Sequence, residues 1–147
     1  MMAFFFGLWI QTSAAAEPVP PVNADKNHIA VEGVDVVAYF EQGAVTPGSA
    51  EHTVEYQGAT WRFSTAAHQN AFAADPSRYA PQFGGYCAWA VAHGYTASID
   101  PQAWRIVDDK LYLNYSVNIQ RKWERDRSAQ IAAAEANWPT LIAPQVD

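Results

Sequence analysis

The chain has 147 residues, half of them hydrophobic, and these totals predict one domain with a sizeable core. The formal net charge of −6 gives no attraction for phosphate backbones, so a nucleic acid partner is not expected. The same acidic balance favours cationic partners, metal ions included.

Residues 1–16 have the pattern of an export signal. They carry no charged side chain, and the small residues at 13–16 offer a cleavage site. The apolar run is shorter than the ~20 residues needed to cross a bilayer, so we expect no transmembrane span in the mature chain. The sequence thus predicts a periplasmic or secreted protein with a signal peptide over 1–16, and an uncleaved anchor is the alternative. A flexible, proline-containing leader is expected over 17–28, and a single domain over 29–143.

The first part of the domain combines an ambiguous apolar segment with a hairpin. Residues 29–40 are rich in β-branched side chains but also fit one helical stripe, so strand and helix both stay open. Two alternating stretches, 52–56 and 60–63, flank Gln57-Gly58. This arrangement predicts a β-hairpin with one apolar side.

Helix signals follow the hairpin. Ser64 or Thr65 can cap a helix, which Asp75-Pro76 then ends. A short apolar helix is expected over 86–92, and another helical turn over 100–104.

The last part of the chain predicts a second hairpin and a long helix. The hairpin turns on Asp108-Asp109, and the helix begins after Asn114 or Ser116, runs to about Asn137 and ends before Pro139. Charges of both signs on this helix indicate a solvated face, and they belong to Arg121, Lys122, Glu124, Arg125, Asp126 and Arg127. The sequence shows no internal repeat. We therefore expect a compact α+β domain in which short antiparallel hairpins alternate with helices.

Seven short motifs occur in order over most of the domain. They are Gly33-x-Asp35-x-Val37-Ala38-Tyr39-Phe40, Trp61-x-Phe63-Ser64 with His68 and Phe72, Asp75-Pro76-x-x-Tyr79, Gly84-Gly85-Tyr86-Cys87-Ala88, Ile99-Asp100-Pro101-x-Ala103-Trp104, Lys110-Leu111-Tyr112-Leu113-Asn114-Tyr115 and Asn137-Trp138-Pro139. In this order the region resembles the YHS domain-containing proteins, specifically their small exported single-domain members.

The resemblance implies a function related to metal ions. The wider YHS group is similar to metal-binding domains found beside copper and other heavy-metal transporters, which often use two cysteines four residues apart as ligands. On this chain those positions hold Ser64 and His68, and a further cysteine position falls close to Ala38. The resemblance therefore leaves at most one inherited ligand position, as histidine.

Cys87 is the only cysteine, and with His68 it forms the main candidate metal site. Thiolate and imidazole together suit copper(I) or zinc. His93, Asp35 and Tyr39 are candidates for the outer shell of such a site. The alternative for Cys87 is a small buried residue of the core.

We therefore predict a non-enzymatic protein that binds or handles a soft or borderline metal ion, copper or zinc. One alternative is a small-ligand or protein-interaction module in which Cys87 is structural and aromatic side chains line a pocket. The other is a thiol-dependent enzyme with Cys87 as nucleophile and His68 or His93 as base. The surroundings of the Cys87 sulfur and of the imidazoles distinguish these three functions.

Overall fold

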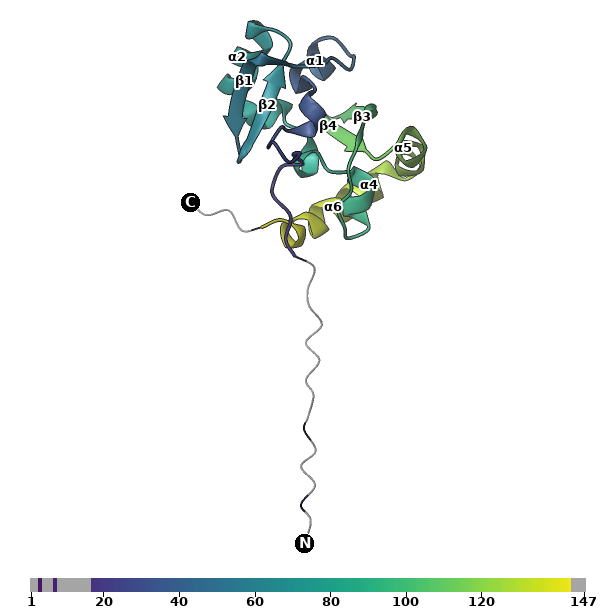
Figure 1. Cartoon of the computed structure of the whole chain (residues 1–147). Helices are drawn as coiled ribbons and strands as arrows, with labels where there is room; N and C mark the ends of the chain where they lie inside the picture. The colour runs from purple at the N-terminus through teal and green to yellow at the C-terminus, as the bar shows by residue number, and fades with distance from the viewer. Residues whose placement is uncertain (1–2, 4–6, 8–16, 144–147) are drawn as a thin grey trace.

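The computed structural model describes residues 17–143, together with residues 3 and 7. It shows the expected α+β domain, in which short antiparallel hairpins alternate with helices (Figure 1). Within the described residues the strands form two separate hairpins, β1 (Ser49–Tyr56) with β2 (Ala59–Phe63) and β3 (Asp100–Val107) with β4 (Lys110–Asn114). The helical segments are η1 (Val31–Gly33), α1 (Val36–Glu41), α2 (Ala66–Ala74), α3 (Pro76–Tyr79), η2 (Gln82–Gly85), α4 (Ala88–Ala92), α5 (Val117–Glu124) and α6 (Arg127–Leu141). None of the helices in this part of the chain combines the length and the apolar character that a membrane crossing requires.

Both hairpins turn through two residues with a left-handed backbone. Gln57 and Gly58 have φ angles of 52° and 78°, and Asp108 and Asp109 have φ angles of 51° and 61°. Two successive positive φ angles define a type I′ turn, whose twist matches the twist of the strands that it joins. The two predicted hairpins are confirmed.

Buried aromatic rings join each hairpin to the helix that follows it. The ring of Phe72 in α2 is fully buried, with its centroid 4.9 Å from that of Phe63 and 5.1 Å from that of Trp61. Trp123 in α5 is also fully buried, with its ring 5.3 Å from that of Tyr112. Because each ring removes a large apolar area from water, these contacts contribute to the stability of a domain without disulfides.

The two hairpins belong to two halves of the domain with the same order of elements. In each half a left-handed 3-10 turn (η1 or η2) leads to a short helix (α1 or α4), then a hairpin, then a longer helix (α2 or α5). The strand register repeats as well, because the irregularity between Ser49 and Thr53 recurs between Asp100 and Trp104, with an offset of 51 residues. The domain is thus an internal repeat, and the expectation from the sequence that there is none was wrong.

The helix caps repeat at the same offset. The Thr65 hydroxyl accepts a hydrogen bond from the amide of His68 at the start of α2. The Ser116 hydroxyl accepts one from the amide of Ile119 at the start of α5. His68 and Ile119 therefore hold equivalent positions in the two halves.

A glutamine one residue beyond each of these positions fastens the helix to its hairpin. Nε2 of Gln69 donates to the carbonyl oxygen of Thr53 over 2.8 Å, and Nε2 of Gln120 donates to that of Trp104 over 2.8 Å. Both acceptors lie on the first strand of their hairpin. Each bond satisfies a carbonyl group that a two-stranded sheet leaves without a neighbouring strand.

Residues 100–104 form the start of β3, so the helical turn expected there is wrong. Asp100 pairs with Asn114, and regular pairing resumes only at Trp104. The irregular stretch accommodates Pro101, which has no amide hydrogen to donate to a strand partner.

The long helix expected up to Asn137 is divided into α5 and α6. The backbone leaves the helical conformation at Asp126, where φ is −144° and ψ is 52°. In a continuous helix Trp123 and Ala134 would lie about 16 Å apart along the axis. The turn instead brings both into one buried cluster. The helix was predicted to end before Pro139, but Pro139 lies inside α6, two residues before its end.

The segment 17–28, expected to be a flexible leader, packs against the domain. Val22 is 2% exposed, and the amide of Asn23 donates to the carbonyl oxygen of Gly84 over 2.8 Å. A side chain on Gly84 would collide with the carbonyl oxygen of Pro21, so the glycine allows the leader to cross at this point.

Candidate functional site

Asp35 is the centre of a buried hydrogen-bond cluster at the start of α1. Its Oδ1 accepts from the amide of Ala38 over 3.1 Å. Its Oδ2 accepts from the amide of Ser64 over 2.8 Å, from the Ser64 hydroxyl over 2.6 Å and from Nδ1 of His68 over 2.7 Å. The Asp35 side chain is 0% exposed and that of His68 is 13% exposed. These four bonds compensate the buried carboxylate for the water it has lost.

The pKa of Asp35 lies below its ordinary value of 3.8 in spite of this burial. Burial alone raises the pKa, because it disfavours the charged form. The hydrogen bonds from Ser64, His68 and Ala38 outweigh burial because they stabilise the carboxylate. A carboxylate can only accept, so Nδ1 of His68 carries a proton and Nε2 is the ring nitrogen left for another partner.

The two positions at which the YHS resemblance implies cysteine ligands, Ser64 and His68, meet at this cluster with Ala38, which lies close to a third such position. Ser64, His68 and Ala38 each donate at least one hydrogen bond to Asp35. Where the resemblance implies cysteine ligands, this chain therefore has the Asp35 carboxylate and the groups that donate hydrogen bonds to it. Sequence reasoning had assigned Asp35 to an outer shell, whereas it is the group that orients His68.

Cys87 has a separate hydrogen-bond environment at the start of α4. Its side chain is buried, and Sγ accepts from the amide of Tyr115 over 3.2 Å. The thiol donates to Oδ1 of Asn114 over 3.5 Å, and the same oxygen accepts from the amide of Trp89 over 3.0 Å. Burial raises the pKa of Cys87, and the nearby amides of Ala90, Tyr115 and Trp89 offset only part of this effect. The protonated thiol is therefore the form favoured at neutral pH.

Asp35 and Cys87 hold equivalent positions in the two halves, although they lie 52 residues apart, one more than the offset of the hairpins. Each is the N-cap residue of the short helix of its half. Each accepts from the backbone amide of the first residue after its hairpin, Ser64 in one case and Tyr115 in the other. The second half thus has a thiol in place of the carboxylate and Ile119 in place of the imidazole.

The second half has a pocket where the first half has its polar cluster. The pocket has a volume of about 340 Å³ and opens over Cys87. Its other lining residues are apolar or aromatic, and they are Trp89, Ala90, Tyr95, Ala97, Tyr115 and Ile119. The lining is apolar because Cys87 and Ile119 stand where the first half has the carboxylate of Asp35 and the imidazole of His68. These two side chains do not form the hydrogen bonds that fill the corresponding space in the first half.

Large hydrophobic side chains are exposed around this pocket. Within the described residues they are Tyr95 at 47%, Tyr115 at 57% and Val117 at 41%, and the two tyrosines line the pocket. Exposed aromatic groups around a concave apolar surface are typical of ligand sites.

The other two predicted site residues contribute to structure. Nδ1 of His93 lies 2.7 Å from the carbonyl oxygen of Trp89, and its ring stacks on the indole with centroids 3.8 Å apart. The hydroxyl of Tyr39 donates to the carbonyl oxygen of Pro101 over 2.8 Å, and burial raises the pKa of this phenol far above its ordinary value. Tyr39 thereby links α1 to the second hairpin.

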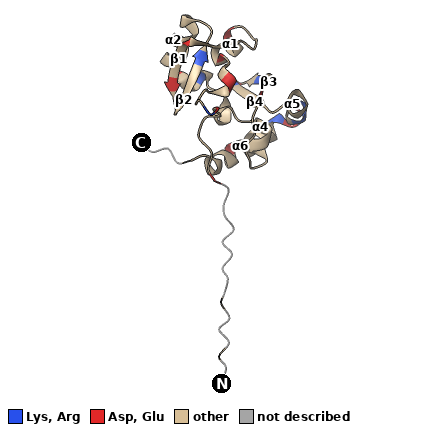
Figure 2. Ribbon diagram, viewed as in Figure 1, with Lys and Arg blue, Asp and Glu red and all other residues tan. Residues whose placement is uncertain are grey.

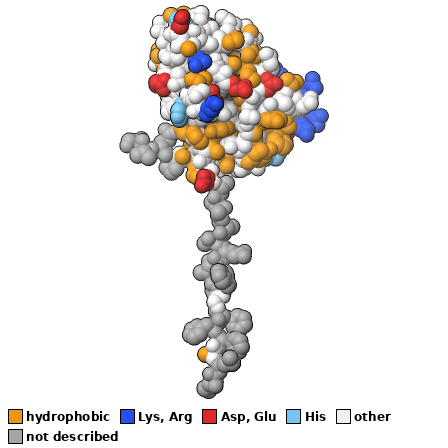
Figure 3. Space-filling model, viewed as in Figure 1, with side chains coloured by type: hydrophobic (Ala, Val, Ile, Leu, Met, Phe, Trp, Pro, Cys, Tyr) orange, Lys and Arg blue, Asp and Glu red, His pale blue; other side chains and the backbone are white. Residues whose placement is uncertain are grey.

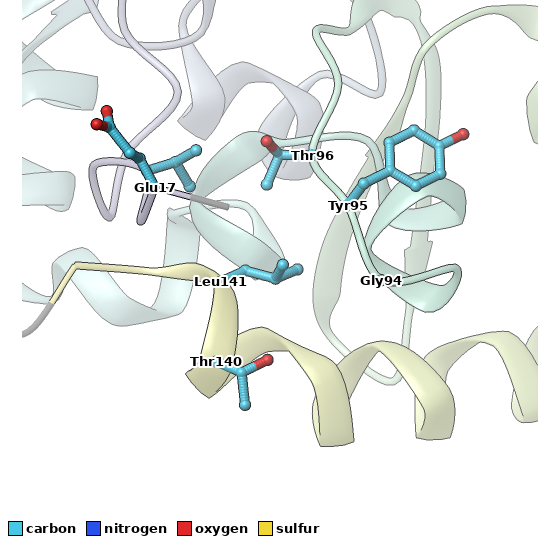
Figure 4. A pocket seen from close by; sticks show the side chains of 7 residues that line it. Glu17, Gly94, Tyr95, Thr96, Thr140 and Leu141 are labelled. Carbon is cyan, nitrogen blue, oxygen red and sulfur yellow. The ribbon is translucent and has the colours of Figure 1, made fainter. Parts of the chain in front are cut away.

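A second hollow, of about 300 Å³, adjoins the first. It lies between the start of the leader and the end of α6, and Glu17, Thr140 and Leu141 line it (Figure 4). Tyr95 belongs to both hollows, and in Figure 4 its ring points away from Leu141 and Thr140.

The structure brings Asp35 and His68 together, whereas Cys87 and His68 have different hydrogen-bond partners. Over residues 17–143, no group of three or more His, Cys, Asp and Glu side chains is arranged to hold a metal ion. A copper or zinc site at Cys87 and His68 stays a prediction. In the same part of the chain no imidazole is hydrogen-bonded to the Cys87 thiol.

Sequence reasoning missed most residues of the second site, among them Asn114, Tyr115 and Ile119. A signal for them exists in the offset of 51 residues. The capping residue and the glutamine of the first half, Thr65 and Gln69, recur as Ser116 and Gln120. Aligning the two halves on these pairs places Tyr115 opposite Ser64.

Comparison with family models, with curated proteins and with solved structures gives no match for this chain. The function is therefore inferred from the geometry of the two sites.

Proposed function

We propose that this protein is a non-enzymatic, exported binding module of the YHS type whose pocket at Cys87 takes a small organic ligand with a flat, apolar body. The observation that carries the proposal is the apolar pocket with two exposed tyrosines at its opening, Tyr95 and Tyr115. The volume of about 340 Å³ lies at the lower end of the range for small-molecule sites, about 300–1,000 Å³. A bound ligand would remove aromatic surface from water, which is a favourable process of about 25 cal/mol per Å².

The role of Cys87 in this proposal is structural. Its sulfur ties α4 to the end of β4 through Tyr115 and Asn114, and it forms the base of the pocket. A protonated thiol at this place leaves the base uncharged, which suits an apolar ligand. The Asp35 cluster in the other half fixes the fold.

The test uses N-phenyl-1-naphthylamine, a neutral aromatic probe whose fluorescence rises in apolar surroundings. We expect saturable binding to the purified protein, with quenching of tryptophan emission because Trp89 lines the pocket. Tyr115→Ser removes an exposed wall of the pocket and should weaken binding, as should Ile119→Asp. Val117→Asp is the matched control, because Val117 is exposed beside these residues but does not line the pocket. Equal binding by Tyr115→Ser, Ile119→Asp and the unaltered protein would contradict the proposal.

A second candidate function, binding of copper or zinc, is favoured by the Asp35–His68 pair. A carboxylate that holds one imidazole nitrogen and leaves the other free is common next to metal ligands in proteins. A bound metal would act as the cargo of a buffering or delivery protein. Competition titration with copper(I) and with zinc tests it, and His68→Ala and Cys87→Ser should each weaken uptake. Unchanged uptake in both variants would exclude a site at these residues.

A further inference from the structure

One wall of the pocket comes from α5, which belongs to a segment with an excess of positive charge. The chain has nine Lys and Arg residues against fifteen Asp and Glu, yet six of the nine lie between 105 and 127, with only four of the fifteen. Two of these basic residues, Arg121 and Lys122, belong to α5, which carries blue segments in Figure 2, and Figure 3 shows Lys and Arg side chains at the edge of the domain beside an area of hydrophobic side chains. An acidic protein with a local basic area has a potential that favours anions there.

Lys122 connects this charge to the pocket. Ile119 of α5 lines the pocket, and Lys122 lies three residues further along the same helix. Residues three apart are neighbours on one face of a helix, so Lys122 lies on the same face of α5 as Ile119. Arg121 lies two residues after Ile119, which places it on nearly the opposite face.

Lys122 is also a cation that no acidic group neutralises within the described residues. The nearby carboxylate of Glu124 forms ion pairs with Arg105 over 2.9 Å and with Arg127 over 3.1 Å. Arg121 donates to Oδ1 of Asn118 over 3.3 Å. Lys122 is exposed and has no such partner in this part of the chain. Its ammonium group is therefore available to an anionic ligand.

From this arrangement we infer that the ligand of the Cys87 pocket is an amphipathic anion, a flat apolar body that carries a carboxylate or sulfonate. The body lies against Tyr95, Tyr115 and Ile119, and the anionic group pairs with Lys122. The inference rests on the proposed function and specifies its ligand class. The cation at the edge orients the ligand, because the apolar lining by itself provides no directional contact.

Two probes with one aromatic body test the inference. 8-Anilino-1-naphthalenesulfonate is N-phenyl-1-naphthylamine with an added sulfonate. At low ionic strength we expect the anionic probe to bind about two- to fivefold more tightly, as one exposed ion pair provides. The preference should decrease with added salt, because salt screens exposed charges.

Two charge variants locate the effect. Lys122→Gln should remove the preference for the anionic probe and leave the affinity for the neutral probe unchanged. Arg121→Gln makes the same change of charge on the other face of α5 and should keep the preference. Thermal unfolding of each variant shows whether the fold is intact, so that binding to a loosened protein is recognised.

The outcomes separate the two proposals. Equal affinity for both probes, with binding still weakened by Tyr115→Ser, would overturn the anionic ligand and leave the proposed function in place. Loss of the preference to the same extent in Lys122→Gln and Arg121→Gln would also overturn it, since a general positive potential then explains the data. Binding of both probes that is insensitive to Tyr115→Ser and Ile119→Asp would contradict the proposed function itself.

Discussion

Asp35 and Cys87 occupy equivalent positions in the two halves of the repeat. Each side chain accepts a hydrogen bond from the backbone amide of the residue that follows the hairpin of its half. At Asp35 the acceptor is a charged carboxylate that gathers four hydrogen bonds and closes the site. At Cys87 the acceptor is a neutral thiol, and the space beside it stays open. One scaffold therefore supports a sealed polar cluster in one half and an apolar pocket in the other.

Removal of the Asp35 carboxylate should destabilise the protein strongly. Asp35→Ala leaves the hydroxyl of Ser64 and Nδ1 of His68 without their acceptor in a buried place. We expect a loss of about 2–6 kcal/mol in the free energy of unfolding, because each buried donor left without a partner costs about 1–3 kcal/mol. Urea denaturation followed by tryptophan fluorescence measures it. Glu51→Ala, which removes an exposed carboxylate on β1, is the control and should change the free energy by less than about 0.5 kcal/mol.

The same carboxylate gives stability a defined dependence on pH. Since the folded-state pKa of Asp35 is lowered, the unfolded chain takes up a proton more readily than the folded protein. Its contribution is complete above the unfolded pKa, close to 3.8, and is lost as the pH falls through the lower folded value. Urea denaturation between pH 7 and pH 2 should show this loss in the unaltered protein. Asp35→Asn should show a smaller dependence below pH 4, and an identical profile would contradict the assignment.

The two glutamines should contribute equally, because they make the same bond in the two halves. Gln69→Leu and Gln120→Leu each remove a donor to a strand carbonyl group. We expect each to lower the free energy of unfolding by about 0.5–1.5 kcal/mol. The double variant should show the sum, since the two bonds share no partner. A large difference between the single variants in urea denaturation would argue against equivalent roles.

The Cys87 thiol should react slowly in the folded protein. It is 1% exposed, and burial raises its pKa, so little thiolate is accessible at neutral pH. A thiol-specific chromogenic reagent should detect almost no reaction before denaturation and one equivalent afterwards, because Cys87 is the only cysteine. Rapid reaction of the folded protein would instead favour the thiol-dependent enzyme that the sequence left open.

Gly84 should tolerate alanine less well than Gly94. Both have positive φ angles, +64° and +87°, so alanine meets backbone strain of about 1–2 kcal/mol at either position. At Gly94 the new methyl group meets no atom within 4 Å, whereas at Gly84 it collides with the carbonyl oxygen of Pro21. The difference in unfolding free energy between Gly84→Ala and Gly94→Ala therefore measures the contact between leader and domain. Equal losses in urea denaturation would show that this contact contributes little.

Local signals in the sequence predicted the elements that short-range chemistry determines. Gln57-Gly58 and Asp108-Asp109 marked the hairpins, and Thr65 and Ser116 were among the expected helix caps. The sequence was less informative where a contact between residues far apart in the chain determines the position of a side chain. Nothing local shows that Asp35 accepts from His68, because the two lie 33 residues apart and meet only through packing of α1 on α2.

Tertiary contacts also explain the incorrect element predictions. Helical periodicity continues across Asp126, yet the chain turns there so that Ala134 can join the core around Trp123. Asp100-Pro101 has the composition of a helix start, but its position in the repeated hairpin makes it a strand. The repeat itself is hidden because the equivalent side chains differ in chemistry, as Asp35 and Cys87 do.

The two ends of the described chain are joined by a short parallel pairing, in which the amide of Val19 donates to Leu141 over 2.9 Å and the amide of Ala143 donates to Val19 over 2.8 Å. A pulling force applied to residues 17 and 143 would load these two bonds before any element of the repeats. The core would bear tension only after these two hydrogen bonds break, so the pairing protects the core of the domain from a force applied at its ends.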